Sequence, residues 1–397
     1  MVAAPAGALP VHRLHDEDIE RLLATGERRP ELTSLFGEQG YRELSALARR
    51  AATKRAPTGP RVYVLPGLMG SRLGSRGQLL DDVLWVDLIE IAAGHLTRLA
   101  LPGGAKLVAL GAMLLNTLKL KLSLKLAGFD ARLHAYDWRR RVGDLASELN
   151  ARIGRDARTD GVLLVGHSMG GVVARVALGR QRTDRIARVV QLGAPNHGSF
   201  APVLALRGVY PSVRKLAALD RRHTAEDLAR IIFRTLPSLH ELLPDPRLAG
   251  GPNLFDVDSW PDDALRPDAK LLEMAAAEQA AWPEPDERCL HIAGVRQDTV
   301  VGATLRGSEF EFSLAMCRQR SSGSGQAACS AAAASSRRAS GRSASPGQDF
   351  ASNRLAPPAS RGSGSSSCSA GSVRKTMRAR SSAECLRSSA ASLRTVG

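Results

Sequence analysis

The sequence predicts an α/β fold in which a mostly parallel sheet is covered by helices on both faces. Short apolar segments of strand length alternate along the chain with longer segments that carry apolar residues at helical spacing. Hydrophobic residues make up 44% of the 397 residues, which is enough to bury a sizeable core and excludes a wholly disordered chain. A helical insertion and a low-complexity C-terminal tail complete the predicted organisation.

The first expected element is a helical N-terminal segment over residues 1–55. Ile19, Leu22 and Leu23 recur at helical spacing among charged residues, a pattern typical of an amphipathic helix. A stretch rich in Pro and Gly then marks a break in the chain. We therefore expect a docked helical segment, followed by the main domain over residues 56–316.

Short apolar runs are predicted to form the strands of the sheet, because runs of this length bounded by turns are typical of buried parallel strands. These segments are 61–65, 129–136, 161–165, 188–192 and 290–295. Helices are expected at 142–153 and 172–178, and two long apolar-rich segments, 84–101 and 106–127, have helical length. The lysines within 106–127 favour a core-facing or interfacial helix over a membrane span.

The strand pattern lapses over residues 199–285. Helical pieces such as 225–235 alternate there with loops rich in Pro and Asp. An insertion between two core strands lies over the carboxyl end of a parallel sheet, so we expect this region to be a helical lid.

The composition changes abruptly at about residue 317. Residues 321–397 contain 22 Ser, and their 11 Lys and Arg against 2 Asp and Glu give +9 of the net charge of +16. No apolar periodicity continues, so 317–397 is predicted to be a disordered, low-complexity tail. The remaining body is only mildly basic and has no basic stripe interleaved with aromatic residues, so no nucleic-acid partner is expected.

A Gly-x-Ser-x-Gly motif provides the strongest functional signal. Gly166, Ser168 and Gly170 follow a predicted apolar strand and precede a predicted helix. A sharp strand-to-helix turn strains its middle residue and exposes the hydroxyl above the sheet, while the flanking glycines avoid clashes with neighbouring backbone. Ser168 is therefore the predicted nucleophile, and the alternative is a glycine-rich turn with an incidental serine.

A serine nucleophile also needs hydrogen-bond donors for the oxyanion that forms in the transition state. One donor is expected to be the backbone N–H of Met169, the residue after the nucleophile. The second is expected from the loop after the first core strand, residues 66–71. The alternative for this loop is an ordinary turn at the end of a strand.

Several motifs occur in a recognisable order along the chain. They are VLPGLMGSRL at 64–73, YDWR at 136–139, GHSMGG at 166–171 and LGAPNHGS at 192–199. Together they resemble the lecithin:cholesterol acyltransferase family of α/β-hydrolases, including its bacterial lipase-like members, over about residues 61–316. The resemblance implies an α/β-hydrolase fold with Ser168 as nucleophile and the Met69 and Met169 amides as oxyanion donors. It also implies acyl-ester or phospholipid substrates, with transfer of the acyl group to water or an alcohol.

Other polar residues of these motifs are expected to have structural roles. Asp137 precedes the nucleophile, whereas the acid of an α/β-hydrolase follows it, so Asp137 and Arg139 are expected to form a structural ion pair. His167 and Ser168 are adjacent on a sharp turn and point apart, which predicts a packing role for His167. His197 is expected to shape the loop after the fourth strand.

The acid of the triad is missing from its expected place. Asp298 follows the strand at 290–295, so topology nominates it. The resemblance instead implies an acid after a hairpin whose last strand is 309–315, and there the sequence reads Cys-Arg-Gln-Arg at 317–320.

The base is missing as well. No histidine follows His291, and the other late candidates are His223 and His240 in the expected lid. Because the family-like pattern stops at about residue 316, we hypothesise that 317–397 is an out-of-frame translation of a GC-rich gene. The alternatives are a natural pseudoenzyme with a basic tail, or a base recruited from elsewhere in the chain.

Two functions of different classes are compatible with these observations. The first is a serine hydrolase or O-acyltransferase that acts on lipid acyl esters through an acyl-serine intermediate. The second is a catalytically dead lipid-binding or scaffold protein of the same fold, since the triad histidine is absent. No cofactor or metal is expected, because the histidines and cysteines lack ligand spacing. The expected partner is a lipid or acyl-ester substrate, and a peripheral contact with a membrane surface is a further option.

The cellular location is predicted from what the sequence lacks. No run of about 18 uncharged apolar residues occurs, and the first residues lack the basic start of a secretory signal. All five cysteines lie at or after Cys289, which does not suit a disulfide framework. These features predict a cytoplasmic protein.

Overall fold

The computed structural model describes most of the chain before residue 317. The described residues are 10–54, 57–77, 81–102, 106–155, 161–181, 184–247, 251–294, 298–307, 309–316, 318–319 and 329–330. The chain divides into two compact units, 1–338 and 339–397, and all described residues belong to the first.

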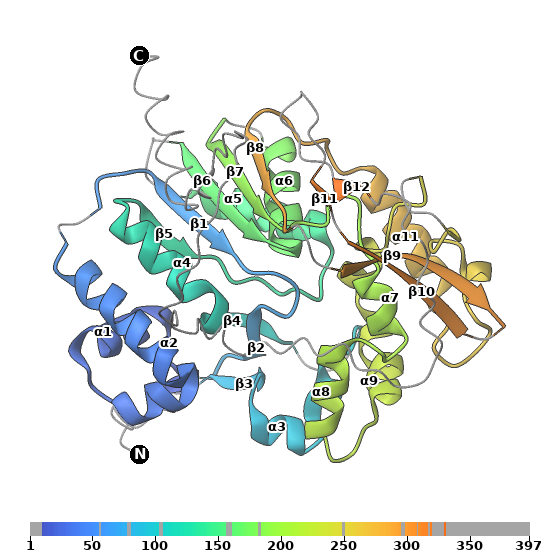
Figure 1. Ribbon diagram of the computed structural model, residues 1–397, viewed down its shortest axis with the longest axis horizontal. Coiled ribbons are helices and arrows are strands. Elements are labelled where there is room, and N and C mark those ends of the chain that lie inside the picture. Colours follow the sequence, from blue (N-terminus) through green and yellow to red (C-terminus); the bar gives the residue numbers. More distant parts are fainter. Residues whose placement is uncertain are drawn as a thin grey trace, which may run out of the picture. The chain divides into compact units, whose positions relative to one another are not determined.

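A parallel sheet forms the centre of the first unit (Figure 1). Its order is β5-β1-β6-β7-β8, and every neighbouring pair is parallel. The strands are β1 (Arg61–Leu65), β5 (Asp130–Leu133), β6 (Val162–His167), β7 (Ile186–Leu192) and β8 (Cys289–Ile292). The predicted α/β fold class, with a parallel central sheet and surrounding helices, is confirmed.

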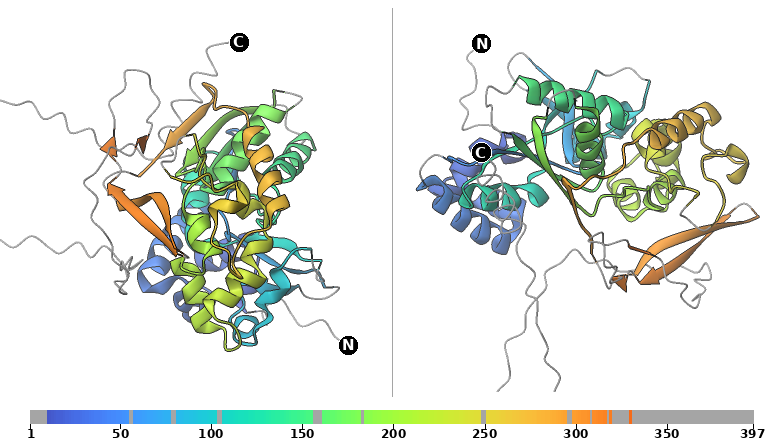
Figure 2. Two further views of the ribbon diagram at one scale, coloured as in Figure 1. Left: turned by 90° about the vertical axis from the view of Figure 1, so that its right-hand side faces the viewer. Right: turned by 90° about the horizontal axis from the view of Figure 1, so that it is seen from above.

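Helices cover both faces of the sheet (Figure 2). The chain moves from β1 to β5 in one direction and from β5 to β6 in the other, so right-handed crossovers put α4 (Leu114–Leu126) and α5 (Val142–Gly154) on opposite faces. α6 (Met169–Arg180) packs beside α5, and its residues from Met169 to Leu178 are all buried. In the described part of the chain, no helix combines the length and the apolar content needed to cross a bilayer.

Two N-terminal helices pack on α4. α1 (Asp16–Thr25) and α2 (Arg29–Ala52) follow the short η2 (Val11–Arg13). Together with Leu118 and Leu122 of α4, these elements bury an apolar cluster separate from the main core.

A buried lysine fixes α1 on α4. Lys121 of α4 is 1% exposed, and its ammonium group pairs with Asp16 and with Glu20, the latter at 2.5 Å. Burial alone would lower the pKa of Lys121, but the carboxylates of Glu20 and Asp16 raise it above its ordinary value. Removal of either partner would leave a buried charge uncompensated, so this cluster ties α1 to α4.

The regions 84–101 and 106–127 are not the long helices that their apolar content predicts. They contain, with the segment just before them, β2 (Ser71–Ser75), β3 (Asp82–Trp85), α3 (Leu88–Ala92), η3 (His95–Leu99), β4 (Val108–Ala112) and then α4. β3, β2 and β4 form a small antiparallel sheet in that order. The expected core-facing helix is present over α4, but the prediction is wrong at β3 and β4. These strands are held by pairing with β2, a non-local contact that periodicity does not reveal.

A helical insertion lies between β7 and β8, where the strand pattern lapses. It contains α7 (Ala201–Leu206), α8 (Pro211–Leu219), α9 (Ala225–Ile231), η4 (Phe233–Thr235), α10 (Pro237–Glu241), η5 (Val257–Ser259) and α11 (Ala269–Ala280). Leu228 and Phe233 are among the residues that join this insertion to the main apolar core.

An antiparallel hairpin follows β8. Among the described strands, β9 (Asp298–Arg306) and β10 (Glu309–Met316) pair with each other and with no third strand. The predicted strand at 309–315 is therefore one arm of this hairpin. Within the predicted tail, β11 (Arg318–Gln319) pairs with β12 (Cys329–Ser330). The rest of that tail lies outside the described residues.

Candidate active site

The carboxyl ends of the parallel strands meet at one edge of the sheet, which is where open α/β sheets bind ligands. β6 ends at His167, and Ser168 follows directly. Leu65 at the end of β1 is the register partner of Gly166, so the loop 66–71 begins beside Ser168.

Ser168 occupies the turn between β6 and α6. Its backbone has φ 52° and ψ −126°. Residues that carry a Cβ rarely adopt a positive φ. Its N–H donates to the carbonyl of Leu192 at 2.9 Å, which ties the turn to the end of β7. Such a strained residue persists only where the surrounding structure fixes it, and functional sites are where such residues cluster.

Glycines on both sides of Ser168 allow three backbone segments to approach closely. A Cβ at Gly166 would lie 2.4 Å from the carbonyl oxygen of Gly170, and a Cβ at Gly170 would lie 2.3 Å from that of Pro66. Backbone atoms have little room to move aside. β6, α6 and the loop after β1 therefore require glycine at these points.

Two aromatic residues of the YDWR motif hold the loop 66–71. The hydroxyl of Tyr136 donates to the carbonyl of Pro66 at 2.6 Å. The indole N–H of Trp138 donates to the carbonyl of Ser71 at 3.0 Å. Both side chains are buried, so each bond fixes the direction of one peptide group in the loop.

A third carbonyl of the loop, that of Met69, accepts a hydrogen bond from the indole N–H of Trp85 in β3 at 3.0 Å. Met69 has φ 60°, the second strained residue of the site. The N–H groups of Leu68 and Met69 take no hydrogen-bond partner among the described residues. A Cβ at Gly67 would lie 3.0 Å from the Cβ of Ser168, which shows how closely the loop approaches the serine.

The second predicted oxyanion donor is Met169, the first residue of α6. The first amides of a helix have no intrahelical acceptor and carry the positive end of the helix dipole. The structure therefore brings together Ser168, the Met169 amide and the amide-bearing loop at Met69. This arrangement suits the stabilisation of negative charge on an oxygen attached to the carbon atom that a serine nucleophile would attack.

The expected ion pair between Asp137 and Arg139 is present at 2.7 Å. Arg139 is 2% exposed and also donates to the carbonyl of Leu99 at 3.3 Å. Both roles are structural, because they tie the YDWR motif to the end of η3.

The loop after β7 binds the helical insertion. The N–H of Ser199 donates to the carbonyl of Leu242, and that of Asp245 donates to the carbonyl of His197, both at 2.9 Å. Gly198 has φ 72°, and a Cβ there would lie 1.9 Å from a carbonyl oxygen of the insertion. His197 thus contributes its backbone, as expected for a loop-shaping residue, and its side chain is exposed.

Asp298 begins the hairpin after β8. It is exposed and is the register partner of Met316 in the β9–β10 sheet. Among the described residues, its carboxylate forms no hydrogen bond with a histidine or with Ser168. The structure therefore does not join the candidate acid to the nucleophile.

Two of the three late histidines have other partners. His223 lies between α8 and α9, and its Nδ1 is 3.0 Å from the carboxylate of Asp220. His240 of α10 is fully buried, with its Nδ1 2.8 Å from the carbonyl of Leu236. Burial lowers the pKa of His240 to about 4, so it is neutral over the physiological range.

His291 is the late histidine that lies on the parallel sheet. It is on β8 opposite Gln191 of β7, two strands from β6. Burial lowers the pKa of its ring, and the backbone of Ala194 partly opposes this shift. Its Nε2 has no hydrogen-bond partner among the described residues, and no described histidine bonds to the hydroxyl of Ser168. Nor do the described residues gather three or more His, Cys, Asp or Glu side chains into a metal-binding group.

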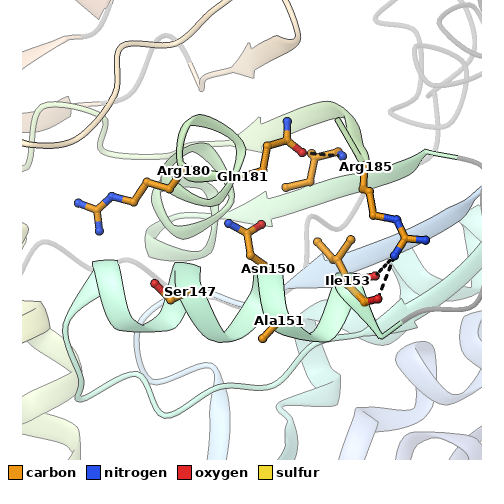
Figure 3. Close-up of a pocket in the computed structure, with 9 residues that line it drawn as sticks. Ser147, Asn150, Ala151, Ile153, Arg180, Gln181 and Arg185 are labelled. Atoms are coloured by element: carbon orange, nitrogen blue, oxygen red, sulfur yellow. Dashed lines mark hydrogen bonds between the residues drawn. The ribbon is translucent and has the colours of Figure 1, made fainter. Parts of the chain in front are cut away.

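A cavity of about 370 Å³ lies away from Ser168, between α5, α6 and the start of β7 (Figure 3). Asn150 points from α5 toward α6 and donates to the carbonyl of Ala177 at 2.9 Å. Arg185 donates to the last carbonyls of α5. These residues mark the amino-terminal edge of the sheet, opposite to the candidate active site.

Sequence reasoning missed the aromatic donors of the site. Trp85 lies in a segment predicted as a helix, so its hydrogen bond to Met69 had no local signal. Tyr136 and Trp138 belong to a motif noted for Asp137. A buried Tyr hydroxyl or Trp indole N–H needs a hydrogen-bond partner. The presence of Tyr136 and Trp138 in this motif could therefore have predicted hydrogen bonds to a nearby loop.

A family model matches the part of the chain around the nucleophile turn. This model, the PGAP1-like alpha/beta domain, matches residues 147–233. Comparison with the curated proteins gives no match.

Among solved structures, the chain is similar to the Tle4–Tli4 complex, with 14% identity over 60% of this chain and 75% of that chain and a TM-score of 0.36. It is also similar to the Bacillus licheniformis lipase BlEst2. The mature form gives 19% identity over 47% of this chain and 60% of that chain, with a TM-score of 0.24. The propeptide form gives 16% identity over 61% and 37%, with a TM-score of 0.30. The chain covers less than two thirds of either lipase chain.

Proposed function

We propose that this protein is a serine ester hydrolase of the lipase type, with Ser168 as its nucleophile. The observation that carries the proposal is the strained backbone of Ser168, at φ 52° between β6 and α6, directly beside the loop 66–71. The match of 147–233 to an alpha/beta domain model supports an α/β-hydrolase domain around this turn.

In the proposed reaction, Ser168 Oγ attacks the carbonyl carbon of an ester and forms a C–O bond. The hydroxyl proton passes to a base, and the carbonyl oxygen becomes an oxyanion held by the N–H groups of Met69 and Met169. Collapse of this intermediate breaks the ester C–O bond and releases the alcohol with a proton. Water then attacks the acyl-serine, releases the carboxylic acid and restores Ser168.

His291 is the base that the geometry favours. Neighbouring strands are about 4.8 Å apart, so β8 lies roughly 10 Å from β6 at the same edge of the sheet. His240 is enclosed in the insertion, and His223 is held by Asp220 between α8 and α9. No described histidine is hydrogen-bonded to Ser168, so this proposal requires the His291 ring to move toward the serine.

The substrate that we propose is a lipid acyl ester. The helical insertion at 199–285 is proposed to act as a lid, since its residues Leu242 and Asp245 are bonded to the loop after β7 beside the nucleophile turn. The motif resemblance to the lecithin:cholesterol acyltransferase family further favours transfer of the acyl group to an alcohol as well as to water. We also propose the boundaries 1–55, 56–316 and 317–397 for the helical segment, the hydrolase domain and the tail.

A non-catalytic lipid-binding protein of the same fold is the second candidate. The observation that favours it is that no described histidine bonds to Ser168 and that Asp298 stands apart on the hairpin. Removal of the base from a serine triad lowers turnover by about a millionfold, so a chain with no base would bind esters without cleaving them.

Labelling of the purified full chain with a fluorophosphonate probe tests the two candidates. The hydrolase proposal expects covalent labelling at Ser168 that disappears in Ser168→Ala, with an unchanged circular dichroism spectrum. Folded wild-type protein that takes no label would contradict it and favour the non-catalytic candidate. For a protein that labels, acyl transfer is then measured from p-nitrophenyl esters with and without an alcohol acceptor.

The reading frame of 317–397 is tested separately. We propose that this stretch is out of frame, since the family-like pattern ends at about residue 316. Sequencing the coding DNA over codons 310–330 from independent isolates is expected to reveal an inserted or deleted base. An unbroken frame in every isolate would exclude this explanation.

A further inference from the structure

Large apolar side chains are exposed on the short helix α3. Leu88 and Ile89, the first two residues of this helix, are 65% and 77% exposed. Leu115 of α4 is 54% exposed and lines the same groove as these two residues. The exposed apolar surface therefore continues from α3 to α4. Apolar surface that extends beyond single side chains marks a contact with another molecule or with a membrane.

The helix α8 lies beside α3 at the same end of the molecule (Figures 1 and 2). The side chain of Arg222, just after α8, packs on Gly94, just after α3, where a Cβ would lie 2.7 Å from its Cδ. A helix rises by about 1.5 Å per residue, so Leu88 lies only about 9 Å along α3 from this contact. Leu219 at the end of α8 is 49% exposed and adds to the apolar surface.

The outer face of α8 and the residues that follow this helix are basic. Four exposed side chains form no hydrogen bond or ion pair with any residue that the structure describes: Arg214, Lys215, Arg221 and Arg222. They are therefore available to a partner outside the chain. Residues 211–230 hold five Lys and Arg and three Asp and Glu, which gives a net charge of +2.

Most carboxylates of this surface already have partners within the chain. Asp220 is buried and lies 3.0 Å from the ring of His223. Glu90 of α3 lies 2.9 Å from His95 and 3.5 Å from Arg98. The other pairs are Asp87 with Arg13, Asp82 with Arg98, and Asp227 with Arg230. Glu226 is exposed without such a pair, so the unpaired charges of 211–230 are four cations and one carboxylate.

This surface belongs to elements that also hold the candidate active site. Leu88 comes three residues after Trp85, whose indole N–H donates to the carbonyl of Met69. α8 is part of the insertion, in which the carbonyl of Leu242 accepts from the N–H of Ser199 after β7. A partner bound at α3 and α8 would therefore contact two elements that are bonded to the loops around the nucleophile turn.

We propose that α3 and α8 dock this protein on an anionic bilayer. Leu88, Ile89 and Leu219 would enter the boundary between headgroups and acyl chains, and the cations of α8 would lie among the lipid phosphates. Burial of apolar side chains and attraction of basic residues to an anionic leaflet add in such a contact. The inference deepens the proposed function, since a lipid ester would be reached from this surface, but the binding itself does not require hydrolysis.

Sedimentation with sucrose-loaded vesicles tests the proposal. The full-length Ser168→Ala protein is mixed with phosphatidylcholine vesicles that contain either no phosphatidylglycerol or one third of it. In low salt we expect the partition coefficient to be at least about tenfold higher with phosphatidylglycerol. High salt should reduce this difference, because ions screen the charges. This protein cannot form an acyl-serine, so a failure to bind is distinct from a failure of the hydrolase proposal, which the fluorophosphonate label reports.

A first double variant tests the apolar contact. Leu88→Ser with Ile89→Ser removes two exposed side chains and should lower partitioning into phosphatidylglycerol vesicles at least about tenfold. The matched control is Leu290→Ser with Leu314→Ser, which removes two leucines that are 42% and 46% exposed on other strands. The control should bind as the parent protein does.

A second double variant tests the charge. Arg214→Gln with Lys215→Gln should lower partitioning about tenfold in low salt and have little effect in high salt. The matched control is Arg49→Gln with Arg50→Gln, two exposed cations near the end of α2, where Lys54 bonds to the last residue of α4. This control removes the same charge at the opposite end of α4 from the groove and should change binding little.

Ile89→Trp distinguishes insertion into the bilayer from adsorption by charge alone. All four native tryptophans are buried, so they are protected from a quencher in the lipid. With brominated phosphatidylcholine in the anionic vesicles, we expect strong quenching of the tryptophan emission in Ile89→Trp. Leu314→Trp, exposed on β10, is the control and should be quenched no more than the parent protein.

Several outcomes would overturn the proposal. Equal partitioning into vesicles with and without phosphatidylglycerol excludes the role of the α8 cations. Binding that is unchanged in both double variants assigns the adsorption to another part of the chain, such as the basic segment 317–397. A dimer in solution that dissociates in Leu88→Ser with Ile89→Ser would identify a second copy of the chain as the occupant of this surface.

Discussion

The two halves of the candidate active site differ in how they are built. The nucleophile half consists of the Ser168 turn and the loop 66–71, and nearly every carbonyl of that loop has a buried donor or a backbone partner. The acid–base half is expected after β8. There the described chain enters a separate hairpin that begins at the exposed Asp298.

The difference shows that the nucleophile half does not depend on the region after β8. Its strain is maintained by Gly166 and Gly170, by Tyr136 and by Trp85, all of which precede the insertion. β8 itself is an edge strand in the described chain, with Leu290 and Ile292 exposed by 42% and 36%. The strained turn at Ser168 can therefore form whether or not a base reaches it.

The largest expected effect comes from closing the space at the nucleophile turn. In Gly170→Ala, the new Cβ would lie 2.3 Å from the carbonyl oxygen of Pro66 and 2.7 Å from that of Leu65. We expect a loss of about 3 kcal/mol in the free energy of unfolding, measured by urea denaturation, together with loss of fluorophosphonate labelling. Gly154→Ala, at the end of α5 with open space around it, is the control and should be neutral or slightly stabilising. Wild-type stability in Gly170→Ala would refute the close approach.

The contact of Glu241 in the insertion with the start of α5 is expected to depend on pH. Glu241 of α10 is 1% exposed and accepts from the N–H of Val142 at 2.7 Å, with Arg141 at 3.3 Å and Glu278 nearby. Burial raises the pKa of Glu241 to about 7, above its unfolded value of 4.5. The folded protein therefore binds this proton more tightly, and the stabilisation present below pH 4.5 is lost as pH rises through 7.

Glu241→Gln should remove this dependence. At pH 5 the variant and the wild type should have similar free energies of unfolding, and at pH 8 the variant should be more stable by up to about 3 kcal/mol. Urea denaturation at both pH values measures the difference. The control is Glu148→Gln, at an exposed position of α5. Its free energy of unfolding should differ from that of the wild type by the same amount at pH 5 and at pH 8. If Glu241→Gln differs from the wild type in free energy of unfolding by the same amount at pH 5 and pH 8, the carboxyl of Glu241 is ionised at both pH values.

The donors to the loop 66–71 are tested by removing one hydroxyl. Tyr136→Phe loses the 2.6 Å hydrogen bond to Pro66 and leaves that buried carbonyl without this donor. We expect a loss of about 1–2 kcal/mol in stability. A looser loop should also slow labelling roughly tenfold, which corresponds to about 1.4 kcal/mol. Tyr41→Phe is the control, since Tyr41 is buried in the N-terminal cluster without a side-chain hydrogen bond among the described residues. An unchanged labelling rate in Tyr136→Phe would show that this hydrogen bond to the loop does not affect the reactivity of Ser168.

The nucleophile half is also the part that the sequence predicts best. β6 and α6 follow from a continuous apolar run, two glycines and a second apolar run, all of which are local signals. The positions of β1 and β7 follow from apolar runs of the same kind. A parallel sheet buried on both faces produces this pattern directly.

The parts that escaped prediction depend on distant residues. β3 and β4 require β2 as a partner, and the apolar residues around them fit a helix equally well when read locally. Trp85 is hydrogen-bonded to Met69, and Glu241 is hydrogen-bonded to Val142, although the partners are far apart in the sequence. Nothing in the spacing of these residues reports such contacts, since they are set by how the elements pack.

The smallest expected effect belongs to the residue that topology nominates as the acid. Asp298 is exposed on the hairpin, so Asp298→Asn should change the rate of fluorophosphonate labelling less than twofold and the stability by no more than about 0.5 kcal/mol. Asp184→Asn, at a position that is 99% exposed, is the matched control. The acid of a triad orients the base, so a true acid would instead lower the labelling rate by several orders of magnitude, about 10⁴-fold in a serine protease. A loss of that size in Asp298→Asn, with the control unchanged, would mean that the hairpin brings its carboxylate to the edge of the sheet and that both halves of the site are assembled.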